Sequence, residues 1–458
     1  MKPSKSEIRT KAYKVPTVTF AQDGQLTSLG GLVFFQALFA RLRLKDRLNQ
    51  CFRHLGTNSA YGAGTIFLLL TVHVLIGCRR LSEIDDYRGD PCLERLLGLR
   101  VLPTKSTLCR ALQSMGEQAV ENVRHLVRGL VNDRLEAQRF ARLTLDFDGS
   151  VQSTTRHAEQ TAMGFNPKKK GARSYYPLFC TIAQTSQFFD MLHRSGNVHD
   201  SSGACDFAVA CFQSVRTSRP RACLESRMDS AFFSDAMLTT LAAQRVEFTI
   251  SVPFERFAEL KGWIESRKRW RPLDERWSFF EREWKAKSWN VSYRLLFLRQ
   301  RRAIRRKGPL QLDLFEPRDY EYEYTVIATN KRQGAHAVRD FHHGRGSQEK
   351  LFGEGKQHAA LDLVATRRIH GNQLFTLAGM LAHNLGRELQ MATRPPERKT
   401  LPKRPPCWIF VDLGTLQRQF LRRAAQLLRP QGQLTIRIAA STPIRRKMLD
   451  ILKPLLAA

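Results

Sequence analysis

The sequence has few acidic residues for its length. Its 458 residues include 42 aspartates and glutamates against 74 lysines and arginines, which gives a formal net charge of +32 at pH 7. A basic excess of this size predicts a polyanionic partner, and nucleic acid is the default. A generally basic proteome or a membrane-surface protein would show the same composition, so charge alone leaves these alternatives open.

Long apolar runs and paired cysteines are also missing. The longest apolar run, Gly64–Cys78, is shorter than the ~18–20 residues of a spanning helix. We therefore expect a buried helix, with His73 a satisfied core histidine. The nine cysteines include no C-x-x-C pair, so neither a zinc site nor a disulfide framework is indicated. The N-terminus has no apolar signal segment, and the sequence predicts a cytoplasmic protein with reduced thiols.

Residues 1–140 are predicted to be helical, because apolar residues recur with a helical period on both sides of the buried run. Between two of these helices, the segment LPTKSTLCRALQSM has Thr104 or Ser106 as candidate N-caps. It also carries Lys105 and Arg110. A capped basic helix after a turn is typical of helix-turn-helix DNA readers. The same pattern often arises by chance, so an ordinary surface helix remains an alternative.

The next segment has the pattern of an α/β domain. In RLTLDFDGS apolar and polar residues alternate, as in a strand, so Asp146 and Asp148 project from the same face. Two further strands, 174–184 and 187–196, pair as a hairpin across the Thr185–Ser186 turn. A helix, a strand, a helix and a strand follow. This β-β-β-α-β-α-β order predicts a mixed sheet with helices on its faces.

The region from about 255 to 320 is irregular and basic, and it contains five of the six tryptophans. It ends in the strand-like EYEYTVIATN, which is followed by a charged helix and a long apolar helix. The Pro/Lys/Arg-rich stretch 393–406 has the composition of a linker. In the tail we expect an amphipathic helix over 413–429 and a strand over 433–440.

The charged helix FHHGRGSQEKLFGEGK holds two glutamates, Glu349 and Glu354. On a helical wheel at about 100° per residue, Glu354 points about 140° away from Glu349. Four side chains fall within roughly 60° of one another: His342, Arg345, Glu349 and Lys356. One acid is thus framed by bases and the other is not. Charged stripes are usually solvated helix faces, so the stripe alone is weak support for a site.

Three acids stand at element ends: Asp148 after the first strand, Asp229 after the fourth, and Glu349 on the late helix. Carboxylates that converge repel one another unless a cation neutralises them. Mg²⁺ takes carboxylate and phosphate oxygens. Two such ions about 3.5–4 Å apart can activate an attacking oxygen and stabilise a leaving one. A basic protein with this set suits DNA backbone chemistry, although each acid alone is more simply a helix cap or a surface charge.

The sequence resembles the DDE transposases of bacterial insertion sequences, and most closely the branch named after insertion sequence 1380. The match covers about residues 140 to 392. In the broader clan the late helix carries Tyr, two residues, Arg, three residues, Glu, six residues and Lys. Arg345, Glu349 and Lys356 have this spacing. His342 stands where the tyrosine is expected, and its imidazole can donate a similar hydrogen bond to a phosphate.

Other segments carry the same resemblance. LDFDGS resembles the first-aspartate strand, with Asp148 as the acid and Asp146 as the fallback. RMDSAFFSDAML resembles the second-aspartate segment, with Asp229 as the acid and Asp235 in a helix start. GFNPKKKGARSYYPL looks like the characteristic basic loop of the branch, which here holds Lys168, Lys169, Lys170 and Arg173. The Trp-rich block resembles the β-rich insertion that the clan carries between its second aspartate and its glutamate.

The resemblance implies an α/β fold with an RNase H-like mixed-sheet core. Asp148, Asp229 and Glu349 would be the catalytic acids and would hold two Mg²⁺ ions, for which Mn²⁺ can substitute. Glu354 would be a bystander. The residues expected to bind DNA are Arg345, Lys356, His342, Lys168, Lys169, Lys170 and Arg173. Trp284 or Trp289 would be candidates to stack on a flipped base, as a tryptophan does in some relatives, but a place in the core of the insertion is the favoured interpretation.

The implied activity is cut-and-paste DNA transposition, in which element ends are cleaved and the freed 3′ hydroxyl is joined to target DNA. The expected partners are double-stranded DNA, as terminal inverted repeats and as target, and a second copy of the chain in the DNA complex. The location would be the bacterial cytoplasm, at the nucleoid. The implied domains are a helical DNA-binding domain (1–140), a catalytic domain with its insertion (141–392) and a small C-terminal region (393–458).

Two alternatives remain. A repurposed, non-catalytic DNA-binding protein predicts a damaged set of acids, and all three are present. An RNase H-like nuclease that cuts without joining would differ from a transposase only in its products.

Overall fold

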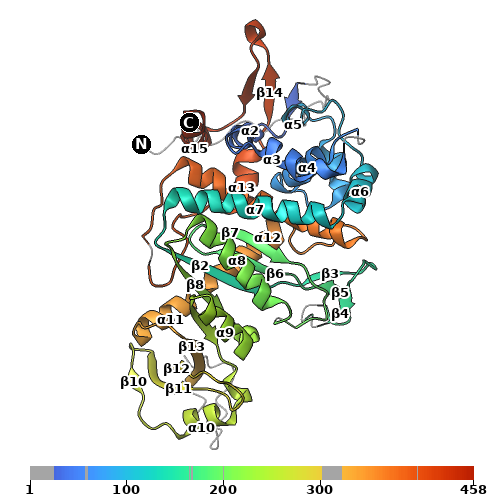
Figure 1. Ribbon diagram of the computed structural model, residues 1–458. Helices are drawn as coiled ribbons and strands as arrows, with labels where there is room; N and C mark the ends of the chain where they lie inside the picture. The colour runs from blue at the N-terminus through green and yellow to red at the C-terminus, as the bar shows by residue number, and fades with distance from the viewer. Residues whose placement is uncertain are drawn as a thin grey trace, which may run out of the picture.

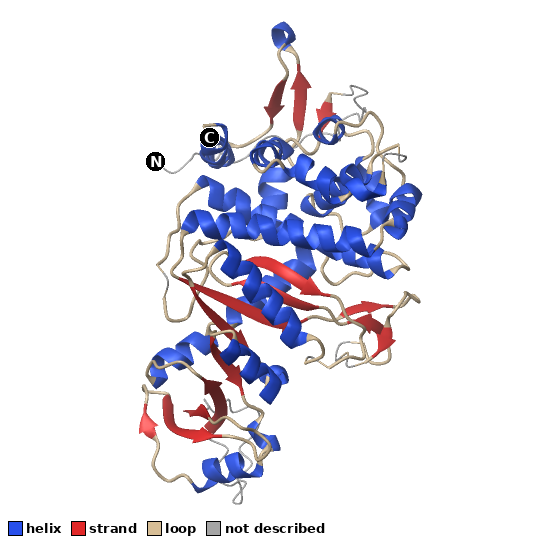
Figure 2. Ribbon diagram, viewed as in Figure 1, coloured by secondary structure: helices blue, strands red, loops and turns tan. Residues whose placement is uncertain are grey.

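The molecule is built around a nine-stranded mixed sheet. The computed structural model describes residues 25–56, 60–164, 166, 169–199, 201–301, 322–399 and 401–457. In Figure 1 the helices from the two ends of the chain lie together on one side of the sheet, and the region around β10–β13 lies at the opposite end. Figure 2 shows the same arrangement by helix and strand. This is the mixed α/β architecture that the sequence predicts.

The strands of the large sheet follow the order β10-β11-β12-β13-β9-β8-β2-β6-β7. β2 is parallel to β8, and β8 to β9, whereas β6 and β7 form an antiparallel hairpin, as predicted. The bounds are β2 (Arg142–Gly149), β6 (Leu178–Ile182), β7 (Gln187–Leu192), β8 (Cys223–Met228), β9 (Glu247–Ser251), β10 (Arg271–Pro272), β11 (Trp277–Trp284), β12 (Tyr293–Arg301) and β13 (Tyr322–Thr329). A side sheet holds β3 (Gln152–Thr154), β4 (Ala162–Met163) and β5 (Arg173–Tyr175).

The two faces of β2 differ in chemistry, because successive side chains of a strand point to opposite sides. Leu143, Leu145 and Phe147 belong to an apolar core that also includes residues of α8 (Ala204–Ser218) and α9 (Asp235–Ala243). The alternate residues Thr144, Asp146 and Asp148 are polar. The predicted alternation is therefore confirmed, and the acids lie on the face opposite α8 and α9.

The helices on the other side of the sheet share a large apolar core with residues of β6 and β7. They are α2 (Leu32–Arg41), α3 (Leu44–Cys51), α4 (Ala63–Leu75), α5 (Pro91–Leu97), α6 (Lys105–Ser114), α7 (Glu117–Gln138) and α13 (Ile369–Thr393). On α4, His73 is fully buried and bonded to the Tyr87 hydroxyl at 2.6 Å, so its core role is confirmed. Within the described ranges, no helix has the length and apolar character to cross a membrane.

The prediction of one helix over 413–429 is wrong. The helical segment is α14 (Leu413–Leu416) followed by a π-helical turn, Gln417–Leu421. β14 (Ala425–Leu428) then pairs with β1 (Leu26–Thr27) near the start of the chain and with β15 (Thr435–Ile438). Because pairing with β1 is remote in sequence, local periodicity cannot reveal it. The chain ends in α15 (Thr442–Leu456), which the sequence reading did not predict.

The region expected as a β-rich insertion contains α10 (Ala258–Ser266) and strands β10 to β12. Its own apolar core includes Trp284, whose side chain is buried and donates to Glu259 Oε2 at 2.9 Å. Trp289 packs against Phe233 and Trp284. These contacts favour the core interpretation of both tryptophans. Most of the basic run RQRRAIRRK lies outside the described residues.

The charged helix expected over 341–356 is two helices, α11 (Ala335–His343) and α12 (Gly346–His358). The break is at Gly344, where an added Cβ would come within 1.8 Å of the Lys403 carbonyl oxygen. A second backbone therefore passes too close to this position for a side chain, which requires glycine there. The prediction that His342 shares one helical face with Arg345, Glu349 and Lys356 is therefore wrong, because His342 lies on α11. Arg345, immediately before α12, and the other two stripe residues on α12 keep their spacing.

Candidate active site

The positions of Asp148 and Asp229 follow from the pairing of two neighbouring parallel strands, β2 and β8. On β2 and β8, Thr144 pairs with Glu225 and Asp146 pairs with Arg227. Asp148 and Asp229 stand two residues further along each strand, at the same edge of the sheet. The Asp229 carboxylate also accepts a hydrogen bond from Ala231 N at 3.0 Å, which caps the short helix after β8.

Arg345 lies between these two carboxylates. Its Nη2 is 3.4 Å from Asp148 Oδ2 and 3.3 Å from Asp229 Oδ2. Burial raises the pKa of Asp148 to about 6, with Asp229 adding to the rise and Arg345 opposing it. The three side chains are 22–32% exposed, so the group is partly open to solvent.

Glu349 is on the first turn of α12, four residues after Arg345 and therefore on the same side of the helix. Its side chain is exposed. No three His, Cys, Asp or Glu side chains of the described ranges gather closely enough to hold a metal ion. The structure thus brings Asp148, Asp229 and Arg345 together and leaves Glu349 nearby but outside the group.

The donor chemistry fits a hard divalent cation. Asp148 and Asp229 offer carboxylate oxygens, which Mg²⁺ and Mn²⁺ accept, and the Arg345 guanidinium lies between them. Burial is the largest cause of the raised pKa of Asp148, and the nearby Asp229 carboxylate adds to it. The residues that would hold the cation are these two aspartates, with Glu349 as the nearest further carboxylate on α12.

His342 does not have the place that a DNA-binding role requires. It is buried, and its ring contacts Ser251 Oγ at 2.9 Å and Thr249 Oγ1 at 3.0 Å. Burial lowers its pKa to about 3, so the ring is neutral at physiological pH. It joins α11 to β9 and is not available to a phosphate in this structure.

The other predicted DNA-binding residues have different environments. Lys169 and Lys170 are exposed, whereas Lys168 lies outside the described residues. Arg173 is half-buried on β5, where its guanidinium donates to Thr161 and ties the side sheet together. Lys356 is half-buried near the end of α12. Of this set, the two exposed lysines are the most accessible to DNA.

Glu354, which the sequence analysis expects to take no part in catalysis, makes structural contacts that the sequence did not predict. Its carboxylate pairs with Arg387 and lies 3.4 Å from His383 Nε2. It also accepts from Leu413 N at 2.7 Å. Although burial raises its pKa, His383 and Arg387 outweigh burial and bring the pKa to about 2. Glu354 thus ties α12 to α13 and α14. The one signal in the sequence is the i, i+4 spacing of His383 and Arg387.

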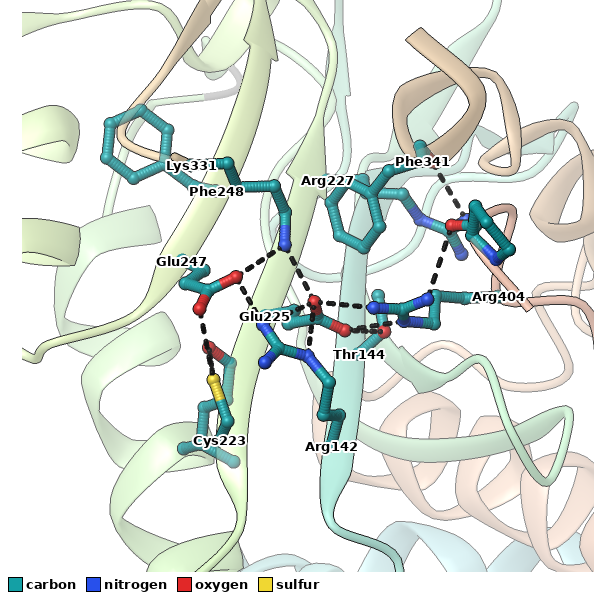
Figure 3. Close-up of polar contacts among 12 residues, drawn as sticks. Arg142, Thr144, Cys223, Glu225, Arg227, Glu247, Phe248, Lys331, Phe341 and Arg404 are labelled. Carbon is teal, nitrogen blue, oxygen red and sulfur yellow. Dashed lines mark hydrogen bonds and ion pairs between the residues drawn. The ribbon is translucent and has the colours of Figure 1, made fainter. Parts of the chain in front are cut away.

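A buried charge network underlies the same face of the sheet (Figure 3). Glu225 on β8 is fully buried and accepts from Lys331 Nζ at 2.6 Å and from Arg404 Nε at 2.8 Å. Arg142 of β2 and the Thr144 hydroxyl also donate to it, at 3.0 and 3.1 Å. Burial raises the pKa of Glu225, but the hydrogen bonds from Arg404 and Lys331 prevail and lower it to about 2.

The next pair along these strands is also neutralised. Asp146 and Arg227 are both buried and hydrogen-bonded to each other. Arg227 further donates to the Lys403 carbonyl at 2.9 Å. Asp146, the fallback acid, is therefore committed to an internal ion pair, which leaves Asp148 as the accessible aspartate of β2. The stretch 393–406, expected as a linker, instead packs across the sheet through Lys403 and Arg404.

Comparison with known proteins gives a family. A family model described as transposase DDE domain group 1 matches residues 10–458. A piggyBac transposase synaptic complex with hairpin DNA is similar at a TM-score of 0.41 and 11% identity, over 78% of this chain and 74% of that chain. A Mos1 mariner paired end complex with Mn is similar at 0.17 and 13%, over 36% and 55%. No curated protein sequence matches significantly.

Proposed function

Because the chain belongs to the family of transposase DDE domains of group 1, we propose that it carries out cut-and-paste DNA transposition. It cleaves DNA at the ends of a mobile element and joins the freed 3′ hydroxyl to target DNA. We assign it to the branch named after insertion sequence 1380, with an RNase H-like core. The observation that carries the proposal is the meeting of Asp148 and Asp229 at the ends of adjacent parallel strands.

The proposed catalytic acids are Asp148, Asp229 and Glu349, and they also hold the metal. A bound pair of Mg²⁺ ions would supply charge neutralisation at the phosphate and activation of the attacking oxygen. The chain's own contribution is positional. The register of β2 and β8 fixes the two aspartates, and α12 presents Glu349 one turn after Arg345. Arg345 and Lys356 supply positive charge for DNA phosphates.

We propose that the N-terminal helices of the 1–140 region recognise the element ends and that two copies of the chain assemble on DNA. α6 has the features that a reading helix requires. Thr104 caps it by accepting from Thr107 N at 3.2 Å. Leu108 and Leu112 anchor it in the core, while Lys105 and Arg110 are exposed. The 141–392 region would hold the chemistry, and the 393–458 region packs back onto the first helices through β14 and β1.

A strand-transfer assay tests the proposal. Labelled DNA carrying the terminal repeats is incubated with the full-length protein, Mg²⁺ and a target plasmid, and products are separated by size. We expect cleaved ends and joined products from the wild type, and neither from Asp148→Asn. Cleaved ends without joined products would identify a nuclease. Binding without cleavage would identify a non-catalytic DNA-binding protein. Either result overturns the proposal.

A further inference from the structure

The C-terminal hairpin projects from the body of the protein. Its strands β14 and β15 pair in antiparallel register, from Ala425 with Ile438 to Leu428 with Thr435. Only the first two residues of β14 also pair with β1, so the outer part is a ribbon of two strands. The turn at its tip, residues 429–434, is exposed throughout. Figure 1 shows the ribbon extending away from the helices, at the end of the molecule opposite β10–β13. The hairpin therefore forms an arm.

The two faces of this hairpin differ, because residues directly opposite each other in an antiparallel pair share a face. Leu427 pairs with Ile436, and both pack against the large apolar core of the helices. The opposite face is formed by two other pairs, Gln426 with Arg437 and Leu428 with Thr435. On that face Arg437 and Thr435 are exposed and Gln426 is half-buried. The hairpin thus has an apolar face toward the core and a largely polar face toward solvent.

The charge of the hairpin and its surroundings is positive. Residues 413–449 include no aspartate or glutamate. Arg429 at the tip and Arg437 on the polar face are both exposed. This charge is complementary to a polyanion. Pairing of β15 with the β15 of a second copy would instead bring arginines of the two copies together, and like charges on paired strands are destabilising. Charge therefore favours nucleic acid over a second copy as the partner of the hairpin.

The polar face has side chains that recognise the edges of base pairs. The major groove of B-DNA admits a two-stranded β-ribbon. In that groove an arginine donates two hydrogen bonds to guanine O6 and N7, a glutamine pairs with adenine, and a threonine hydroxyl contacts either base. Arg437, Gln426 and Thr435 stand together on one face of such a ribbon. Arg429, at the tip, is placed to contact a phosphate.

We propose that the β14–β15 hairpin enters the major groove of the duplex at the element ends and reads bases through Arg437, Gln426 and Thr435. Base contacts give sequence preference, which recognition of a terminal repeat requires. Through β1 the hairpin is joined to the start of the N-terminal region, which also holds α6. The inference rests on the proposed function in one respect, that the chain binds element ends. It adds a second reading element, supplied by the C-terminal region.

Methylation interference tests the contact without any catalytic step. A terminal-repeat duplex is methylated sparsely at guanine N7, an atom of the major groove, and is mixed with full-length protein in EDTA. Bound and free DNA are then compared. For the wild type we expect a short patch of guanines at which methylation blocks binding. Arg437→Ala should lose interference at part of this patch and keep the rest. Identical patterns from wild type and Arg437→Ala would overturn the inference.

Two exposed arginines give a matched pair of variants. Arg437 is on the polar face of the hairpin, whereas Arg445 is on α15, outside it. The quantity measured is the ratio of affinities for the terminal-repeat duplex and a scrambled duplex of equal length. Arg437→Ala should lower this ratio at least about fivefold, as loss of one bidentate guanine contact predicts. Arg445→Ala should leave it unchanged, since loss of a phosphate contact weakens both duplexes equally. Equal ratios in the two variants would exclude base reading by Arg437.

A second copy of the chain is the other candidate partner, because β15 is an edge strand of its sheet. Hydrogen exchange of residues 435–438 is measured without DNA at several protein concentrations. We expect rates that do not depend on concentration. Slower exchange at higher concentration would show that β15 pairs with a second copy, and would overturn the inference.

The strand-transfer assay separates this inference from the proposed function. If Arg437 changes the methylation pattern but the wild type joins no ends, the proposed function fails and the hairpin contact stands. If the wild type joins ends and Arg437→Ala leaves the pattern unchanged, the hairpin contact fails and the proposed function stands.

Discussion

Two neighbouring rows of side chains on one face of the sheet differ in how their charges are neutralised. The lower level is the row with Glu225 and Asp146, and the upper level is the row with Asp148 and Asp229. At the lower level, Glu225 is surrounded by three cationic side chains, and Asp146 is paired with Arg227. Two residues further along the chain, Asp148 and Asp229 are like charges that both contact Arg345. The lower level lies within the paired register of β2 and β8, which runs from Arg142 and Cys223 to Asp146 and Arg227, and the two upper aspartates lie just beyond it.

This difference assigns structural stability to the lower level and chemistry to the upper level. The lower level is buried and neutralised, so it holds β2, β8 and the 401–407 segment in fixed positions. The upper level is partly exposed and brings two carboxylates close together, and their repulsion costs stability and favours a bound cation. A functional site is expected where the protein retains such an imbalance. The predictions that follow test whether the two levels respond differently to the same kind of substitution.

The largest expected effect is on activity at the upper level. Glu349→Gln keeps the size of the side chain but removes a carboxylate that the proposed metal site needs, so cleavage should fall at least about a thousandfold. DNA binding should be retained, because phosphate contacts elsewhere supply most of the affinity. The measurements are end cleavage in Mg²⁺ and in Mn²⁺ and a mobility shift on terminal repeats.

Glu354→Gln is the control on the same helix. It should leave cleavage per folded molecule within a few-fold of wild type, and it should lower stability because Arg387 and His383 lose their partner. Normal cleavage by Glu349→Gln together with an inactive, well-folded Glu354→Gln would show that the catalytic acid has been misassigned.

The second effect is on stability at the lower level. Glu225→Gln removes the buried negative charge that Arg142, Lys331 and Arg404 share, so we expect a loss of about 3–5 kcal/mol in the free energy of unfolding. Urea titration followed by circular dichroism measures it. Glu265→Gln is the control, because the Lys261–Glu265 pair is about 60% exposed at both residues. That change should stay within about 0.5 kcal/mol. Equal losses would mean that burial of the network contributes nothing.

The upper level could be predicted from the sequence because its signals are local. The alternation in RLTLDFDGS placed Asp148 on a strand face, and the resemblance gave the spacing of Arg345, Glu349 and Lys356. That the three acids act together is still a prediction. The helical wheel did not predict the break at Gly344, where the backbone of Lys403, a residue distant in the chain, passes close by.

The lower level could not be predicted, because its members come from remote segments. Arg404 is 179 residues from Glu225, and Lys331 is 106 residues from it. No periodicity relates such positions. The tail shows the same limit, since 425–428 has an amphipathic helical pattern but pairs as a strand with residues near the N-terminus. Composition also suggested a linker over 393–406, and it gave no sign that Lys403 and Arg404 contact the buried charges.

A third, smaller effect is the pH dependence of stability in metal-free protein. The folded pKa of Asp148 is raised to about 6, so ionisation of this group costs stability, a cost that appears as pH rises from about 4 to 6. Asp148→Asn removes it and should be more stable than wild type by about 3 kcal/mol above pH 6, with no difference below pH 4. Glu225 has the opposite sign, since its folded pKa is about 2.

Glu225 therefore contributes stability above about pH 4.5 that is lost as pH falls toward 2. The deficit of Glu225→Gln relative to wild type should be full at neutral pH and should shrink in acid. Urea titrations in EDTA at several pH values measure both variants. If the two differences from wild type changed with pH in the same direction, the upper and lower levels would not differ in charge matching as described.

The smallest effect on stability is expected for substitution of Arg345, the cation of the upper level. Arg345 is 22% exposed and lies 3.3–3.4 Å from its two acids, whereas Arg227 is fully buried and closely bonded to Asp146. Arg345→Gln should therefore change the unfolding free energy of metal-free protein by less than about 1 kcal/mol. Arg227→Gln leaves Asp146 as an unpaired buried charge and should cost about 3–5 kcal/mol. Urea titration of both variants in EDTA gives the comparison, and addition of Mn²⁺ extends it. Because Arg345→Gln removes the cation that lies between Asp148 and Asp229, Mn²⁺ should stabilise this variant more than it stabilises wild type. A loss of several kcal/mol from Arg345→Gln that Mn²⁺ does not restore would show that Arg345 is a structural ion-pair partner like Arg227, and that the two levels of the sheet serve one purpose.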